Sequence, residues 1–236
     1  MIESRGIFKA VPLDVSDPAK LAYILARLVE HESEWTDFQK DAELRTRIAA
    51  KYLYDAVRGE IAILEVWDLR GEASLVGLLG FTKIVPKVDA QFHPVFFDGK
   101  LRNAAGKRDL LLRAMDWAFG VYDLHRLSVV LPENRYALVS FVRQKLGFRF
   151  EGENRTIKQQ RVRPHGHLKT RDLVALTPSW RGAEWGSRKY QAAYVDGRWL
   201  DLLLLSVTRD EFAQFVRTPC PSSSTDPTPS NTPPAT

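Results

Sequence analysis

The sequence predicts an α+β (mixed α/β) fold, in which a mixed, mostly antiparallel central sheet is flanked by helices. The 236 residues are 44% hydrophobic and 27% charged, which suits one sizeable globular domain. Strand-like and helix-like segments follow in the order β-α-α-β-β-β-α-β-α-β. An antiparallel meander in the middle and a βαβ-like second half together favour this class over a purely parallel sheet.

The N-terminal part is predicted to hold one strand and two helices. Residues 6–13 are apolar enough for a strand, and Pro12 indicates its edge or end. Ser16-Asp17-Pro18 signals a helix start, because a capping side chain precedes a proline in the first turn. This helix should reach about residue 34, and a second should span about residues 41–58. Their buried faces are expected to hold Leu21, Ile24, Leu25, Leu28 and Val29, and Leu44, Ile48, Ala49, Leu53 and Val57.

Three strands and a helix are predicted next. Residues 60–68 and 75–85 are apolar and extended, and the turn at residues 70–72 joins them as an antiparallel hairpin. A third strand covers about residues 90–97 and ends at the turn signal Asp98-Gly99. After a polar loop, a helix should run to Phe119. It is expected to bury Leu110, Leu111, Ala114, Trp117 and Ala118.

The stretch of residues 124–155 has the clearest pattern. Residues 126–131 are rich in β-branched and apolar side chains and stop at Pro132, as a strand does. Apolar residues then recur at helical spacing, namely Leu138, Val139, Val142 and Leu146. Gly147 is placed to end this helix in the left-handed conformation, and Phe148 should begin another strand.

Two segments compete for the last strand, residues 168–176 and residues 198–207, and we favour the second. The expected organisation is therefore a core at residues 1–155, an insertion or extended hairpin at 156–195, and the last strand with the C-terminal end at 196–217. Residues 218–236 are mostly Pro, Ser and Thr with few apolar side chains. Such a composition predicts a disordered tail.

Composition limits the function classes. No apolar run approaches the roughly 20 residues of a membrane span, and no signal-like segment follows Met1. Cys220 is the single cysteine, which excludes an intramolecular disulfide and makes a cytoplasmic protein the default expectation. The net charge of +5 and pI of about 9.3 favour an acidic partner, such as a phosphate-rich cofactor, a nucleic acid or an acidic protein.

Residues 124–155 also resemble a known family. The runs Leu-His-Arg-Leu at 124–127, Pro-Glu-Asn at 132–134 and Lys-Leu-Gly-Phe-Arg-Phe-Glu-Gly at 145–152, followed by Arg155, are similar to the second half of GNAT acyltransferases. The resemblance is greatest to the branch that acetylates the N-termini of ribosomal proteins. It extends over roughly residues 8–212 and is specific near 124–155, although the helix between Asn134 and Gly147 looks about two residues longer than the family pattern.

The resemblance implies the GNAT fold and an N-acetyltransferase that uses acetyl-CoA as co-substrate. The acceptor would be an amine of a protein or a small molecule. The family holds the cofactor pyrophosphate at a helix N-terminus, where backbone N–H groups and the helix dipole favour anions. The corresponding loop here contains Arg102, Asn103, Ala104, Ala105, Gly106, Lys107 and Arg108.

This loop departs from the family pattern of Arg or Gln, two residues, Gly, one residue, then Gly or Ala. Ala105 fits, whereas Asn103 replaces the first glycine and Lys100 replaces Arg or Gln. Asn tolerates the left-handed conformation better than most residues, so the turn can survive. The alternative reading is a solvated basic loop that caps a core helix.

The family also binds the pantetheine arm where two neighbouring strands separate. This implies backbone contacts from Val95, Phe96 and Phe97. Asn134 matches the family asparagine at the following helix start, and an equally good role for it is the helix N-cap.

Acyl transfer to an amine needs a proton acceptor and a donor for the leaving thiolate. The family branch often uses a glutamate on the strand that here reads Ala90-Gln91-Phe92-His93-Pro94, where no glutamate occurs. His93 is the best substitute because its pKa lies near neutrality, although a structural role is common for a lone strand histidine. Asp89 and Asp98 are weaker candidates.

No proton donor and no metal site can be assigned from the sequence. Arg143 occupies the position expected for the family tyrosine, and Tyr136 lies earlier on the same predicted helix. His165 and His167 lack further ligands for a metal and are expected to be solvated.

Two alternatives to the acetyltransferase remain open, and the oligomeric state is not determined. The Asn103 and Lys100 replacements and the missing glutamate would suit a GNAT-like structural or interaction protein. The basic residues in 155–171 would suit a GNAT-type enzyme that acts on nucleic acid.

Overall fold

A computed structural model describes residues 1–4, 6–30, 42–97, 106–132, 135–151, 188–195 and 198–218. The described helices are α1 (Pro18–Glu30), α2 (Ala42–Val57), α3 (Lys107–Val121), α4 (Tyr136–Leu146) and α6 (Arg209–Arg217). The described strands are β1 (Ile2–Ser4), β2 (Phe8–Pro12), β3 (Ala62–Asp68), β4 (Ser74–Val85), β5 (Asp89–Phe96), β6 (Arg126–Pro132), β7 (Arg149–Phe150), β8 (Arg188–Val195) and β9 (Arg198–Thr208).

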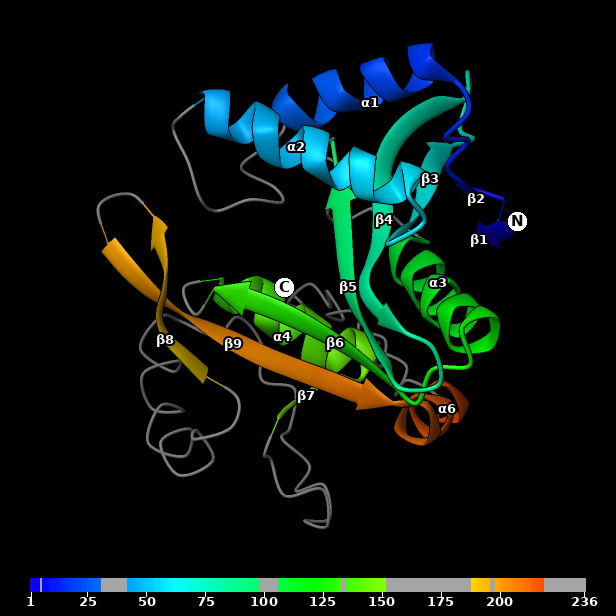
Figure 1. Cartoon of the computed structure of the whole chain (residues 1–236). Helices are drawn as coiled ribbons and strands as arrows, with labels where there is room; N and C mark the ends of the chain where they lie inside the picture. The colour runs from blue at the N-terminus through cyan, green and yellow to red at the C-terminus, as the bar shows by residue number, and fades with distance from the viewer. Residues whose placement is uncertain are drawn as a thin grey trace, which may run out of the picture.

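These strands form one sheet in the order β1-β2-β3-β4-β5-β6-β9-β7, with β8 also paired to β9 (Figure 1). Every neighbouring pair in the described part is antiparallel except β5 and β6, which run parallel. The predicted fold class is therefore confirmed. The predicted strand at residues 6–13 is confirmed as β2, whereas β1 was not predicted and is separated from β2 by a turn with Gly6 at φ 66°.

The strand that completes the sheet beside β6 is β9, which pairs with all seven residues of β6. The competing segment at residues 168–176 lies outside the described residues.

Thr208 caps α6 in a reciprocal capping box, in which its hydroxyl accepts from the N–H of Glu211 and the Glu211 carboxylate accepts from the Thr208 N–H. The division of the chain near residues 155 and 195 stays a prediction, and residues 219–236 lie outside the described part.

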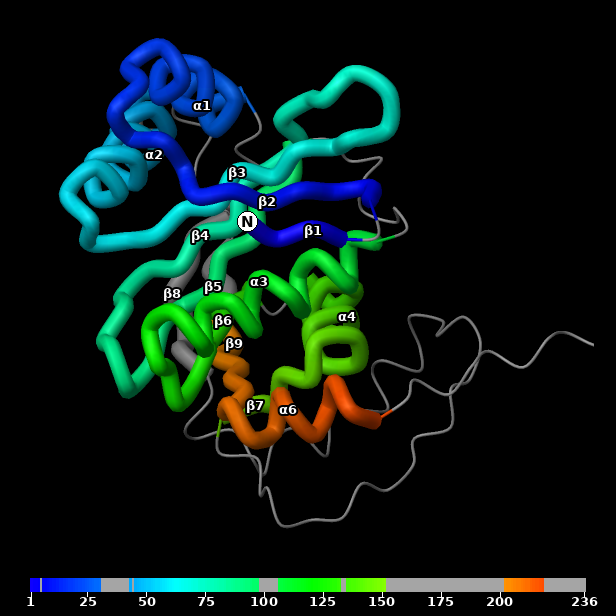
Figure 2. Tube along the Cα trace, turned by 90° about the vertical axis from the view of Figure 1, so that its right-hand side faces the viewer, coloured from blue at the N-terminus to red at the C-terminus, as the bar shows by residue number. Residues whose placement is uncertain are grey.

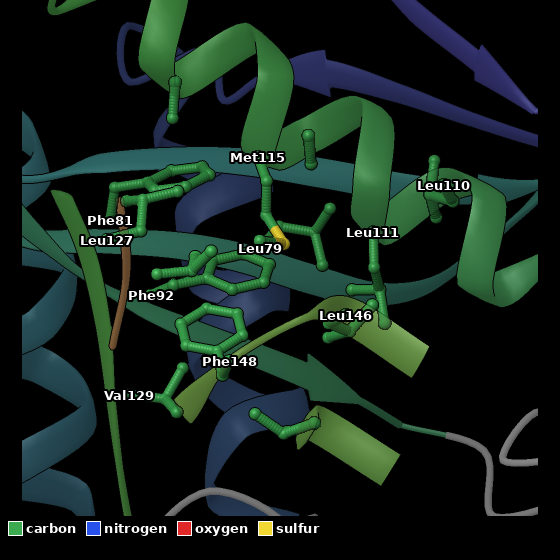
Figure 3. Close-up of a cluster of buried hydrophobic side chains, with 14 of the residues drawn as sticks. Leu79, Phe81, Phe92, Leu110, Leu111, Met115, Leu127, Val129, Leu146 and Phe148 are labelled. Atoms are coloured by element: carbon green, nitrogen blue, oxygen red, sulfur yellow. The ribbon is translucent and has the colours of Figure 1, made fainter. Parts of the chain in front are cut away.

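Helices cover the sheet on two faces. On one face α3, α4 and α6 pack on aromatic and aliphatic side chains of the sheet, and Figure 3 shows the stacked Phe81 and Phe92 side chains close to Met115 of α3. On the other face α1 and α2 pack on a second cluster that includes Leu78, Val95 and Phe97. Successive strand residues point to opposite faces, so the sheet contributes alternately to the two cores.

Two residues predicted to be buried are exposed. Val57 ends α2 with 50% of its surface exposed, and Ala56 takes the buried position instead. Leu138 is 42% exposed because the buried stripe of α4 runs through Val139, Val142 and Leu146. A period of 3.6 residues fixes a stripe only to within one residue at a helix end.

The predicted end of α4 at Gly147 is confirmed. Gly147 has φ 81°. The N–H groups of Gly147 and Phe148 both donate to the Val142 carbonyl. A side chain at Gly147 would contact the ring of Phe215 on α6 at 2.8 Å. The glycine therefore serves both the turn and the packing of the last helix.

Among the described residues, no helix is long and apolar enough to cross a membrane.

Candidate functional site

The parallel strands β5 and β6 part after three paired residues. Asp89, Ala90 and Gln91 face Arg126, Leu127 and Ser128, and beyond these both strands continue without pairing to each other. In Figure 1 the two ribbons start together and their arrowheads diverge. This is the separation that the family resemblance implied for the strands on either side of the pantetheine arm.

Hydrogen-bond alternation shows which backbone groups of β5 point to this separation. Phe97 donates its N–H to the Val76 carbonyl of the neighbouring strand at 2.9 Å. In an antiparallel pair every second residue bonds the same neighbour, so Val95 and His93 also turn their backbone groups to β4. Phe96 and Pro94 therefore direct theirs toward β6. Of the three residues expected to offer backbone contacts, Phe96 alone has this orientation, whereas Val95 and Phe97 face β4.

Two prolines keep the strands from pairing again beyond the point of separation. The carbonyl of His125 accepts the N–H of Arg209, so alternate β6 residues bond β9 and the others, including Val130 and Pro132, face β5. Continued parallel pairing would require N–H donors from Pro94 and Pro132, and proline has none. The ladder has already ended at Gln91 and Ser128, before either proline, and the absent donors of Pro94 and Pro132 keep it from resuming further along.

The N-terminus of α3 lies at the end of β5. Lys107 places its Nζ 3.9 Å from the centroid of the Phe96 ring. Gly106 precedes the helix with φ 89°, and within the described residues no side chain hydrogen-bonds there as a cap. The buried hydroxyl of Ser4 lies 2.8 Å from the Gly106 carbonyl and 2.9 Å from Asp109 Oδ2, which fastens this turn to β1. Figure 2 shows β1 running beside α3.

Arg108 has a partner of a different kind from the phosphate expected for it. Its Nε donates to the Lys145 carbonyl at 3.0 Å, near the C-terminal end of α4. A cation at this position complements the negative end of the helix dipole. The other loop residues Arg102, Asn103, Ala104 and Ala105 lie outside the described residues, as do Asn134 and Asp98, so their roles stay predictions.

His93 lies on the face of the sheet covered by α2, next to the point where β5 and β6 part. It stands directly opposite Gly80 of β4, and residues opposite each other share a face. Burial, and then the positive charge of Lys83, lower the pKa of His93 to about 4. The imidazole is therefore neutral near pH 7 and can accept a proton, but its pKa is not near neutrality as the sequence suggested, which makes it a weaker base than expected.

Tyr52 of α2 completes this cluster. The Tyr52 hydroxyl is buried and occupies the space that a side chain on Gly80 would fill, with Tyr52 Cζ 2.9 Å from that position. Burial raises the pKa of Tyr52 above that of an ordinary phenol, so the hydroxyl stays protonated at physiological pH. Sequence reasoning missed Tyr52. The available signal was Gly80, since glycine inside a strand often marks close approach of another group.

The remaining acid–base candidates have other surroundings. Asp89 forms an ion pair with Arg126 at 2.5 Å, and Arg126 forms a second ion pair with Glu151. The Arg143 guanidinium lies 4.5 Å from the centroid of the Phe150 ring. Tyr136 is the first residue of α4 and is 47% exposed.

No group of three or more His, Cys, Asp or Glu side chains suited to a metal ion occurs in the described part of the chain. The arrangement instead brings together backbone groups of β5 that face the separated strand, a basic helix N-terminus at the end of β5, and a neutral histidine near the point of separation. Such a set can hold an extended ligand with an anionic end and remove a proton from a second reactant.

By sequence, the chain matches no protein-family model and no curated protein. Its structure is similar to that of spermidine N-acetyltransferase from Vibrio cholerae in complex with CoA and spermine. The TM-score is 0.58 at 13% identity, over 87% of this chain and 98% of the other. The spermidine/spermine N-acetyltransferase of the same organism in complex with manganese ions gives a TM-score of 0.55 at 14% identity, over 89% and 96%. At these low identities the structural similarity establishes a shared fold and nothing more. That fold is the GNAT fold.

Proposed function

We propose that the chain is an acetyl-CoA-dependent N-acetyltransferase that transfers acetyl to an amine. The separation of β5 from β6, with backbone groups of Phe96 and Pro94 directed into it, is the observation that carries this proposal. Acetyl-CoA would supply the acetyl group as a reactive thioester.

The residues near the gap have separable roles in this proposal. The Phe96 N–H and the Pro94 carbonyl bind the amide groups of the pantetheine arm. Lys107 and the first N–H groups of α3 hold the phosphates, because both favour negative charge. His93 takes a proton from the acceptor amine, since it lies on β5 two residues beyond the last pair with β6 and is neutral near pH 7.

The acceptor class is inferred from the solved structures that share the fold. The solved structures with this fold include an enzyme bound to spermine, a small amine. This favours a small-molecule amine over a protein N-terminus, and the ribosomal-protein branch gains no support from these neighbours. The basic segment at residues 155–171 lies outside the described part, so no described contact favours a nucleic acid acceptor.

Calorimetry with acetyl-CoA tests the proposal directly. The wild type should bind, and Lys107→Met should weaken binding about fivefold, the equivalent of about 1 kcal/mol for a surface charge pair. Lys51→Met removes the same charge from α2, where Lys51 pairs with Asp55, and should leave the affinity unchanged. Absence of binding at millimolar acetyl-CoA would overturn the proposal.

A thiol-release assay with a panel of amines then tests turnover. Release of free CoA that depends on an added amine is the expected result. Binding without turnover for any amine class would instead favour a GNAT-like binding protein that has lost its chemistry.

A further inference from the structure

The geometry points to Tyr52 as a positioning residue for His93. The two side chains are not hydrogen-bonded in the structure; after rotation of the His93 side chain, the Tyr52 hydroxyl accepts the N–H of one imidazole nitrogen and leaves the other nitrogen unprotonated for the amine proton. This inference deepens the proposed function and rests on it, because it gives His93 the task of accepting the amine proton.

The placement of three elements supports this assignment. The Tyr52 hydroxyl lies where a Gly80 side chain would be, and Gly80 is the residue directly opposite His93. Cβ positions of opposed residues are about 5 Å apart, so the hydroxyl is within reach of the imidazole after rotation of the His93 side chain. Across the sheet the order is Tyr52 above β4, His93 on β5, then the gap.

In this order Tyr52 would orient the base, His93 would be the base, and the reaction would take place where β5 and β6 part. A neutral histidine has one donor and one acceptor nitrogen, and the hydrogen bond at the first nitrogen determines which is which. A phenol can fix the tautomer without adding a charge, and burial keeps Tyr52 in its neutral form. Glycine at position 80 is required, because any side chain there would displace the hydroxyl.

The proton balance of the step is simple. As the amine nitrogen bonds to the acyl carbon, its N–H bond breaks and the proton passes to the free nitrogen of His93. When the carbon–sulfur bond breaks, the same nitrogen returns the proton to the departing sulfur. The hydrogen bond from the other nitrogen to Tyr52 persists through both transfers, so the tyrosine need not ionise.

Nitrogen-15 NMR of histidine-labelled full-length protein tests the inference without any activity. The chain has five histidines, and His93→Gln identifies the signal of His93. Tyr52→Phe should change the tautomer ratio of His93 about fivefold, the ratio produced by one neutral hydrogen bond. Tyr54→Phe, on the same helix with 58% of the side-chain surface exposed, should leave the ratio unchanged.

Kinetics provide the second measurement. Tyr52→Phe should lower kcat about tenfold and leave the KM for acetyl-CoA unchanged, as expected for partial loss of general-base catalysis. Unchanged urea midpoints would show that both phenylalanine variants are folded. An identical His93 tautomer ratio in wild type and Tyr52→Phe would overturn the inference. A wild type without acetyltransferase activity would overturn the proposed function instead, and the tautomer measurement would still decide the relation of Tyr52 to His93.

Discussion

Replacing Gly80 by alanine should destabilise the protein through one contact with Tyr52. The added Cβ would overlap the Tyr52 hydroxyl and lie 2.9 Å from Tyr52 Cζ, so the phenol must shift. Overpacking of this kind costs about 1–3 kcal/mol. Alanine recovers about 0.5–1 kcal/mol over glycine inside a strand, which leaves a net loss of roughly 1–2 kcal/mol.

A double-mutant cycle isolates the cause. Tyr52→Phe removes the oxygen that makes the shortest contact, so Gly80→Ala should cost about 1 kcal/mol less in that background. Gly77→Ala is the matched control, because its Cβ would overlap the backbone carbonyl of Val95, which Tyr52→Phe cannot relieve.

Urea unfolding at a common m-value gives the four free energies of unfolding. The reasoning predicts coupling between positions 80 and 52 and none between positions 77 and 52. A Gly80→Ala variant as stable as wild type, or additive with Tyr52→Phe, would refute the placement of the hydroxyl and with it the orienting role.

Three further predictions concern stability. Because the folded-state pKa of His93, about 4, is below the unfolded value of 6.5, the unfolded chain binds more protons between these pH values. Lowering the pH from 7 to 4 should therefore cost wild type up to about 3 kcal/mol more than His93→Gln in urea unfolding, and equal losses would contradict this. Thr208→Ala should lose about 1 kcal/mol by breaking the capping box with Glu211, seen as a lower thermal midpoint, and an unchanged midpoint would show that α6 does not need its cap. Ser4→Ala should cost about 1 kcal/mol and speed amide exchange after Gly106, whereas unchanged exchange would argue against the Ser4 anchor.

Local chemistry made most of the helices and strands predictable. The helix start at Ser16-Asp17-Pro18 and the helix end at Gly147 depend on groups within a few residues, so the sequence alone located α1 and the end of α4. Apolar runs bounded by turn signals gave β3, β4 and β5 for the same reason. β1 escaped prediction because three residues carry too little periodicity, and its place depends on pairing with β2.

The candidate site was predictable only in part. His93 and the helix start at Gly106 followed from strand and loop patterns, whereas the orientation of Phe96 rather than Val95 and Phe97 depends on which strand each residue bonds. That choice follows from register, which local sequence does not determine.

By itself, the sequence determined the fold class and supplied the two prolines, the strand histidine and the glycine opposite it. The tertiary structure decided that Pro94 and Pro132 withhold donors from the same gap, and that Tyr52 lies over Gly80 beside His93. These relations join residues that are 28 (Tyr52 and Gly80), 38 (Pro94 and Pro132) and 41 (Tyr52 and His93) positions apart, and they exist only once strand register and helix packing are set.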